Sequence, residues 1–177
     1  MRTRGLLAGA AVLGLSGCAA AGAIANTQTI TLRDEAGRTV GTALLTPATE
    51  GVQVVLSVSG LPAGVHGVHI HQTGQCDAPQ FTTAGGHFNP TSRQHGFENP
   101  AGPHAGDLPN LTVGANGSGT LNGVARGVTL EGDAANSLRK DGGTALVVHA
   151  TADDYRTDPS GNSGARIACG VIPPVDD

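Results

Sequence analysis

The sequence predicts an all-β fold, either a sandwich or a Greek-key barrel, on three observations. Short segments that are rich in β-branched residues, or that alternate apolar and polar residues, recur along the 177-residue chain. Turn-forming residues separate these segments, and glycine is abundant, with 28 residues. No long segment has the period of a helix, and residues 126–140 are only a weak candidate for one. This pattern is typical of one domain made of short strands and tight turns.

The strand signal recurs in chain order. The expected strands lie at residues 28–32, 52–58, 67–70, 110–113, 119–124, 145–148 and 166–171. The expected turns lie at residues 34–37, 60–62, 115–117 and 141–143, where Gly, Pro, Asn or Asp concentrate. Aromatic residues make up only 2% of the chain, so the core must be built from Val, Leu, Ile and Ala.

Two segments, residues 72–109 and 150–165, hold few strand signals and many Gly, Pro, Asn and Asp residues. Loops of this length inside a compact domain are usually functional or disordered. Most of the chain's histidines lie in or beside these two segments, which favours a functional role. The formal net charge of −4 and the lack of a basic stripe disfavour nucleic-acid binding.

The N-terminus predicts export. Residues 1–17 place two arginines before a short apolar run, which is typical of a secretory signal and too short for a comfortable membrane span. The alternative is an N-terminal core helix. The end of the run, Leu15-Ser16-Gly17-Cys18, resembles the bacterial lipobox, which implies cleavage before Cys18 and lipid attachment to its sulfur. A plain signal peptide followed by a lone cysteine is the alternative there.

These features divide the chain into a lipoprotein signal at residues 1–17, an Ala-rich tether at residues 18–27 and a domain at residues 28–174. We expect a periplasmic or cell-envelope protein that a lipid on Cys18 anchors to a membrane. Cys76 and Cys169 then remain as a pair, which in an oxidising compartment usually forms a disulfide. Two free thiols are disfavoured outside the cytosol, and a metal-bound pair lacks CxxC spacing.

His69 and His71 are two residues apart on a predicted strand, so both side chains point to the same face. Val68 and Ile70 point to the other face, into the core. A His-x-His strand pair suits one half of a metal site, although a surface pair of histidines is the common alternative. His66 has the parity of Val68 and Ile70, so we expect its ring to face the core and bond to backbone groups rather than to a metal.

A second cluster comprises His87, His95, His104 and Asp107. Three imidazoles and one carboxylate make four ligands, which suits tetrahedral zinc. Calcium and magnesium prefer sets of oxygen ligands and fit poorly. His149 ends the apolar run 145–148 where it meets the second long segment, and taken alone it is as well explained by a structural role as by ligation.

Six motifs occur in order: GVHIH at 67–71, GHFNP at 86–90, HG at 95–96, GDL at 106–108, VHA at 148–150 and GNSGARIACGVI at 161–172. With these motifs the chain resembles the copper/zinc superoxide dismutase family over roughly residues 28–173. The resemblance implies an immunoglobulin-like Greek-key barrel or sandwich of about eight strands with two long functional loops. One departure is Val68, where many members have Phe; a core exchange of this kind should not disturb the metals.

The resemblance also implies ligand roles. The copper ligands would be His69, His71, His87 and His149, and the zinc ligands would be His87, His95, His104 and Asp107. His87 would bridge the two metals.

Four other residues receive roles from the same resemblance. Arg166 matches a cation beside the copper channel, and Cys76 and Cys169 match a disulfide within the subunit. Asp153 resembles a carboxylate that bonds one ligand of each metal, here His69 and His95. Residues 151–160 match no further residue that would steer the substrate.

The implied activity is the dismutation of superoxide to O₂ and hydrogen peroxide, which would protect the extracytoplasmic space. Copper among imidazoles can be oxidised and reduced in turn, whereas zinc keeps its valence. His87 would carry a proton, and the permanently charged Arg166 would hold the anion.

Three rival functions remain at this point. A copper- or zinc-binding lipoprotein without turnover would keep the ligands but would not need Arg166. A zinc hydrolase lacks the HExxH motif, and a copper-only protein is disfavoured by the complete zinc set. A homodimer stays open, since no apolar stripe identifies a dimer face.

Overall fold

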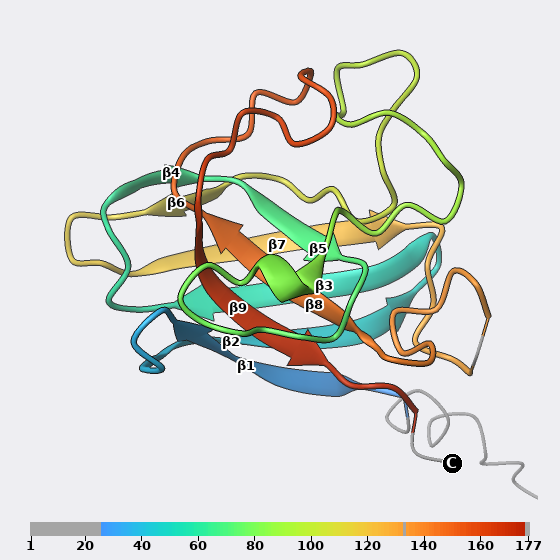
Figure 1. The fold of residues 1–177 in the computed structure, drawn as a ribbon, viewed down its shortest axis with the longest axis horizontal. Helices are drawn as coiled ribbons and strands as arrows, with labels where there is room; N and C mark the ends of the chain where they lie inside the picture. Colours follow the sequence, from blue (N-terminus) through green and yellow to red (C-terminus); the bar gives the residue numbers. More distant parts are fainter. Residues whose placement is uncertain (1–25, 133, 176–177) are drawn as a thin grey trace, which may run out of the picture.

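The computed structural model describes residues 26–132 and 134–175, which form an all-β fold of antiparallel strands (Figure 1). The strands are β1 (Gln28–Asp34), β2 (Thr39–Ala48), β3 (Gly51–Val58), β4 (Gly64–His66), β5 (Val68–His71), β6 (Leu111–Val113), β7 (Gly119–Arg126), β8 (Thr144–His149) and β9 (Arg166–Ile172). One turn of 3₁₀-helix, η1 (Thr82–Ala84), is the only helix in the described part. The all-β prediction is confirmed, with nine strands where about eight were expected.

All nine strands belong to one sheet, in the order β4-β6-β7-β3-β2-β1-β9-β8-β5. The two edge strands, β4 and β5, are neighbours in the chain and only Gly67 separates them, so the sheet curls into a nearly closed barrel. The open edge of β5 is covered by the first long loop: the Ile70 N–H donates to Gly106 O and the Phe88 N–H donates to Ile70 O, both at 2.8 Å. A covered edge cannot pair with another chain.

The core follows from the alternation that the sequence shows. In β3, Val52, Val54 and Leu56 are fully buried, while the residues between them are not. Each fully buried side chain of this kind stabilises the fold by about 1.5–3 kcal/mol. Phe88 is the one aromatic residue in the main core cluster of the described chain, so Val, Leu, Ile and Ala do build the core, as predicted.

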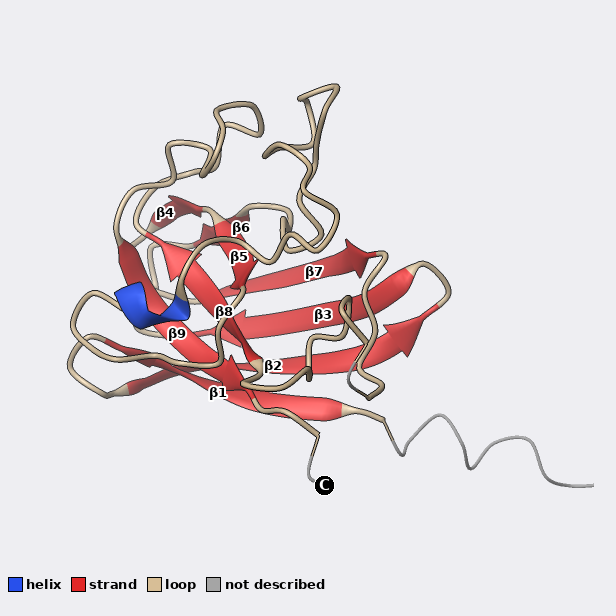
Figure 2. Ribbon diagram, turned by 45° about the vertical axis from the view of Figure 1, so that its right-hand side comes forward, coloured by secondary structure: helices blue, strands red, loops and turns tan. Residues whose placement is uncertain are grey.

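The segments predicted as long loops, residues 72–109 and 150–165, contain no strand, and parts of both lie together above the strands (Figure 2). They are joined directly, because the Glu98 N–H donates to Tyr155 O at 3.0 Å. The predicted disulfide between Cys76 and Cys169 is formed, with 5.7 Å between the Cα atoms, and it ties the first loop to β9.

Two features of the fold were not predicted. Strand β2 was missed because its buried residues Val40, Ala43 and Leu45 do not keep a period of two. Strand β4 was also not expected, and the strand expected at residues 67–70 runs from Val68 to His71. Gly67 lies between the two strands, where an added Cβ would lie 2.8 Å from the Ser163 Cβ.

The weak helix candidate at residues 126–140 is wrong. Its first residue ends β7, and the rest forms turns in the loop between β7 and β8, without a helix at the described positions. The predicted signal and Cys18 lie outside the described residues. Among the residues that the structure does describe, no helix is both long and apolar enough to cross a membrane.

Candidate metal centre

The sheet brings three histidines together. His69 and His71 share one face of β5, with Val68 and Ile70 fully buried on the other, as the alternation predicts. Strand β8 pairs with β5, and His149 at its end therefore lies beside them: His71 Nε2 and His149 Nε2 are 3.3 Å apart. The first loop adds His87, whose ring stacks on His69 with the centroids 3.9 Å apart.

Each of the three strand histidines has one ring nitrogen bonded away from this group. His71 Nδ1 donates to Gly85 O at 2.8 Å and His149 Nδ1 donates to Gly164 O at 3.2 Å. His69 Nε2 lies 2.7 Å from Asp153 Oδ2. A neutral ring that donates on one side presents a lone pair on the other, so His69 Nδ1, His71 Nε2 and His149 Nε2 are free to bind a metal.

His87 differs from these three. Its Nδ1 faces the carboxylate of Asp107 at 3.0 Å, while its Nε2 is buried without a hydrogen-bond partner. The Nδ1 of His69 is the other buried side-chain nitrogen or oxygen in the described chain without a partner. Buried polar atoms nearly always have a hydrogen-bond partner. Two buried ring nitrogens without one, His69 Nδ1 and His87 Nε2, therefore indicate that their lone pairs bind a metal ion. One ligand atom from each of His69, His71, His87 and His149 fits within 4.8 Å.

On the other side of the His87 ring lies the predicted zinc set. Asp107 Oδ1 is 3.0 Å from His87 Nδ1, 3.1 Å from His95 Nδ1 and 3.5 Å from His104 Nδ1. A tetrahedral ion with bonds of 2.0–2.1 Å holds its ligand atoms about 3.3 Å apart, which matches these spacings. Asp107 Oδ2 accepts from the backbone N–H of Gly96 and of His104, both at 3.0 Å, and this fixes the carboxylate.

Asp153 links the two sets. Its Oδ2 lies 2.7 Å from His69 Nε2 and its Oδ1 lies 3.0 Å from His95 Nε2, as the family resemblance implied. Gly161 packs against this pair, because an added Cβ would collide with the carboxylate of Asp153 and the ring of His95. A single buried carboxylate therefore orients one ring in each set.

The electrostatics differ between the two sets. Burial, with a smaller contribution from neighbouring charges, lowers the pKa of His71 to about 2 and that of His149 to about 3. Burial also lowers the pKa of His87 to about 4. For His95 burial opposes protonation, but Asp107 and Asp153 outweigh it and raise the pKa to about 9. Neutral rings are the metal-binding form, so three of these rings are ready to bind a metal while His95 must first release a proton.

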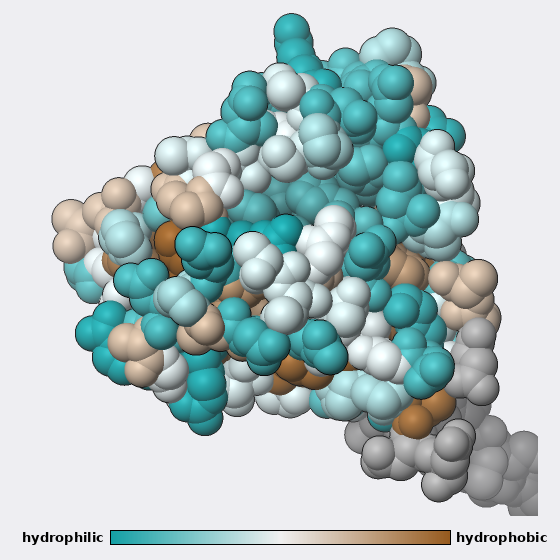
Figure 3. Space-filling model, in the orientation of Figure 1, coloured by the Kyte–Doolittle hydropathy of each residue, from teal (hydrophilic) through white to brown (hydrophobic). Residues whose placement is uncertain are grey.

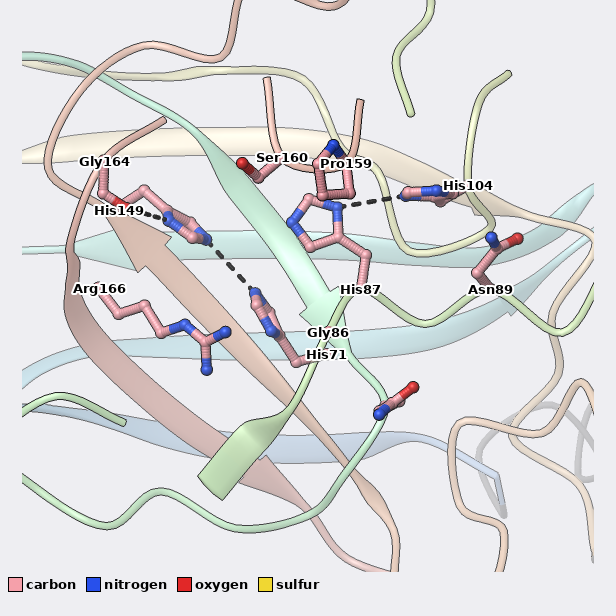
Figure 4. A pocket seen from close by; sticks show the side chains of 11 residues that line it. His71, Gly86, His87, Asn89, His104, His149, Pro159, Ser160, Gly164 and Arg166 are labelled. Atoms are coloured by element: carbon pink, nitrogen blue, oxygen red, sulfur yellow. Dashed lines mark hydrogen bonds between the residues drawn. The ribbon is translucent and has the colours of Figure 1, made fainter. Parts of the chain in front are cut away.

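A cavity of about 560 Å³ opens onto His71, His87 and His149 (Figure 4). It corresponds to the hydrophilic hollow beneath the loops in Figure 3. Arg166 lines the same cavity, because a β-bulge after Val148 makes it the cross-strand partner of His149. Its guanidinium donates to Phe81 O and Gly85 O, both at 2.6 Å, and has no carboxylate partner in the described structure.

A family model described as copper/zinc superoxide dismutase matches residues 39–172. The chain belongs to the copper/zinc superoxide dismutase family. It is 46% identical over 140 residues to superoxide dismutase (Cu-Zn) 1 of Aquifex aeolicus, which covers 78% of this chain and 83% of that relative. It is 40% identical over 179 residues to superoxide dismutase (Cu-Zn) of Deinococcus radiodurans, which covers 93% and 92%. The crystal structure of a SOD-like protein from Bacillus subtilis is 41% identical and covers 81% of this chain and 97% of that one, with a TM-score of 0.78.

The seven predicted ligands of this superoxide dismutase fold thus converge at one place. His66 lies apart from the metal-binding groups, as predicted: its Nδ1 and Nε2 contact the backbone oxygens of His149 and Pro62 at 2.8 and 3.0 Å.

One supporting residue was not predicted. The side chain of Asn110 makes two hydrogen bonds to the backbone of Asp153, both at 2.9 Å: its Oδ1 accepts from the N–H, and its Nδ2 donates to the carbonyl. Tyr155 Oη in turn accepts from the Asn110 N–H at 2.7 Å. A lone Asn after GDLP carries no sequence signal for this role, because its partner is 43 residues away.

Proposed function

We propose that this protein dismutes superoxide to O₂ and hydrogen peroxide at a copper ion that shares one histidine with a zinc ion. The observation that carries the proposal is the position of the His87 ring, which is buried between the two ligand sets. Its Nδ1 faces Asp107, and its Nε2 has no hydrogen-bond partner among the described residues. A ring in that position fits two metals, one on each nitrogen. The convergence of one ligand atom each from His69, His71, His87 and His149 supports these four as copper ligands. The distances from Asp107 Oδ1 to the Nδ1 atoms of His87, His95 and His104 support these four residues as zinc ligands.

Copper held by such a set would supply the one-electron chemistry that dismutation needs, and zinc, which keeps its valence, would orient the shared ligand. The chain's own residues then handle the anion and the protons. Arg166 keeps its charge at any working pH and stands beside His71 and His149, so it can hold an anion at the ligand side of the cavity. His87 Nε2 is the nitrogen that can carry one proton to the product, and solvent in the open cavity supplies the second.

The stoichiometry sets what the site must deliver. Two superoxide ions and two protons yield one O₂ and one hydrogen peroxide, so each turnover consumes one proton per anion. Asp153 keeps His69 and His95 from rotating while this happens.

Metal analysis of the purified protein joined to a superoxide assay tests the proposal. We expect about one copper and one zinc per chain and a second-order rate constant that approaches the diffusional ceiling of about 10⁸–10⁹ M⁻¹s⁻¹. Zinc alone, with no activity after copper loading, would overturn it.

A metal carrier without turnover remains the rival, and Arg166 separates it from an enzyme. Arg166→Ala should keep both metals and lose much of the rate, most visibly at low salt, because an anion held at close range depends on this charge. An unchanged rate would remove the role given to Arg166 and would favour the carrier.

We also propose that the mature protein begins at a lipidated Cys18 and acts in the periplasm or cell envelope. The support is the run of residues 1–17 and the Leu15-Ser16-Gly17-Cys18 pattern. Membrane fractionation and mass spectrometry of wild type and Cys18→Ser test it. The wild type should fractionate with membranes and carry a lipid mass on Cys18, and the variant should be released into the soluble fraction. An unmodified Cys18 in the wild type would refute the anchor.

A further inference from the structure

The substrate of the proposed reaction is an anion, whereas the chain has a formal net charge of −4. Association must therefore rely on local positive charge near the cavity. Among the described residues, three arginines are matched by carboxylates, in the pairs Arg38–Asp34, Arg126–Glu50 and Arg156–Glu98. Such pairs contribute little net field, so the steering charge has to come from the remaining cations.

Lys140 is the only lysine of the chain. It lies half-buried in the loop between β7 and β8, and its side chain makes one hydrogen bond to a described residue, from Nζ to the carbonyl of Asp141 at 3.4 Å. No ion pair joins it to a carboxylate in the described ranges. Its charge is therefore uncompensated by any contact that the structure records.

Lys140 lines a hollow of about 350 Å³ that is distinct from the metal cavity but shares a wall with it. Gln72 and Asn89 line both spaces, and Thr73 adds a hydroxyl on the lysine side. Gln72 directly follows His71 in the chain, which places the shared wall next to the strand histidines.

The same wall also leads to Arg166. The side chain of Gln72 packs on Gly85, since a Cβ added to Gly85 would lie 2.9 Å from Gln72 Nε2. The carbonyl of Gly85 accepts from both Arg166 and His71. The side-chain amide of Gln72 has no hydrogen bond to another described residue, so it can donate to a passing anion. Gln72 thus lines both the hollow that Lys140 lines and the cavity that Arg166 lines.

We propose that Lys140 is a second steering cation, which draws superoxide into this side hollow and passes it over Gln72 to Arg166. The proposal rests on the proposed function and adds an entry path to it. Lys140 does not touch the reacting atoms; it raises the local concentration of the anion at the mouth of the cavity. Lys140 therefore affects how fast superoxide associates with the enzyme. It changes the second-order rate constant and leaves metal binding unaffected.

Kinetics of the copper- and zinc-loaded enzyme test this role. At 10 mM ionic strength, where the Debye length is about 30 Å, we expect Lys140→Gln to lower the second-order rate constant about twofold and Lys140→Glu about fourfold. Lys140→Arg should restore the wild-type rate. Near 1 M salt, where the Debye length is about 3 Å, the variants should converge.

The matched control is Arg33→Gln. It removes one positive charge, as Lys140→Gln does, and Arg33 has no carboxylate partner among the described residues and lines neither hollow. Its loss of rate should be clearly smaller. A Lys140→Gln loss equal to that of the control, or one that persists at high salt, would overturn the proposal.

An independent readout does not depend on turnover. In the diamagnetic copper(I)-zinc protein, inorganic phosphate titrated at constant ionic strength should shift the backbone resonances of Gln72, Thr73 and Lys140, and Lys140→Gln should weaken those shifts. Shifts confined to residues beside Arg166 would contradict the path. If the wild type shows no dismutation at all, the proposed function fails on its own, and the phosphate titration still decides the anion path.

Discussion

The copper side and the zinc side of the centre are built in different ways. His69, His71 and His149 stand on β5 and β8, which pair continuously from Val68 with Val148 to His71 with Ala145. His87, His95, His104 and Asp107 come from a loop without a regular strand, and they are held by bonds around one carboxylate. The positions of the strand ligands are fixed by the backbone pairing of the sheet. The loop ligands position one another, so this side should be the more fragile of the two.

The largest expected effect is on the copper side. His71→Ala should lower the dismutation rate by at least about 1,000-fold, because a metal whose ligand set is broken no longer supports its chemistry. The melting temperature of the zinc-loaded protein should change by only a few degrees, about the effect of 1 kcal/mol, since the β5–β8 ladder uses backbone groups alone. Activity assays and calorimetry measure both. A collapse of the fold would show that the copper side is no more robust than the loop.

The matching change on the zinc side is Asp107→Asn. The amide cannot both accept from the backbone of Gly96 and His104 and offer a charged oxygen to three rings. We expect zinc affinity to fall by more than about 100-fold and the unfolding free energy to fall by about 3–5 kcal/mol. Hydrogen exchange should quicken across residues 72–109 but not in β5 or β8. Exchange that quickens equally in the strands would contradict the division between the two sides.

Asp153 is where the two sides meet, and Asp153→Asn tests their coupling. An amide offers one oxygen where the carboxylate offers two, so either His69 or His95 loses its partner. We expect one of the two metals to bind about 10–100-fold more weakly, as measured by competition with a chelator.

Asn110→Ala should produce a smaller loss of the same kind, because it frees only the backbone of Asp153. Asn122→Ala is the matched control: that exposed side chain accepts only from Gln53, and metal affinity should stay at the wild-type value. Equal losses in the two Asn variants would remove Asn110 from the support of the site.

The difference between ligands on strands and ligands on a loop also explains how much of the site could be predicted from the sequence. Strand periodicity places His69 and His71 on one face and Val68 and Ile70 on the other, since a period of two leaves no choice of side. It fails at β2, where the buried positions do not keep that period. The loop ligands could be grouped only by residue type and resemblance, because their convergence depends on contacts across tens of residues.

The supporting contacts were the least predictable part. Asp153 was found through resemblance, whereas Asn110 was missed, although it makes two hydrogen bonds to the backbone of Asp153. The hollow beside Lys140 depends on the loop between β7 and β8, whose turns replaced the weak helix expected there. Such contacts arise from tertiary packing, and no local pattern encodes them.

The smallest expected effect is on pH dependence, and it has one sign for His71, His149 and His87, whose pKa values are lowered, and the opposite sign for His95, whose pKa is raised. In protein stripped of metal by a chelator, His71 and His149 have pKa values lowered to about 2 and 3, against about 6.5 in the unfolded chain. Between those values the unfolded state binds more protons, so the copper side loses stability as the pH falls below about 6.5. His95, whose pKa is raised to about 9, binds its proton more tightly when folded, so its contribution is lost as the pH rises from about 6.5 through 9.

The melting temperature of the stripped protein should therefore peak near neutral pH and fall by several degrees towards both pH 5 and pH 9. His71→Ala should make the acid limb shallower without abolishing it, because His149 and His87 still titrate there. It should leave the alkaline limb unchanged, because that limb comes from His95. In the metal-loaded protein the acid limb should shift to lower pH, since bound metal competes with the proton for each ring. A stripped protein that becomes more stable on acidification from pH 6.5 to pH 5 would show that the strand rings are not buried in neutral form, and the two sides would no longer differ in the way the geometry indicates.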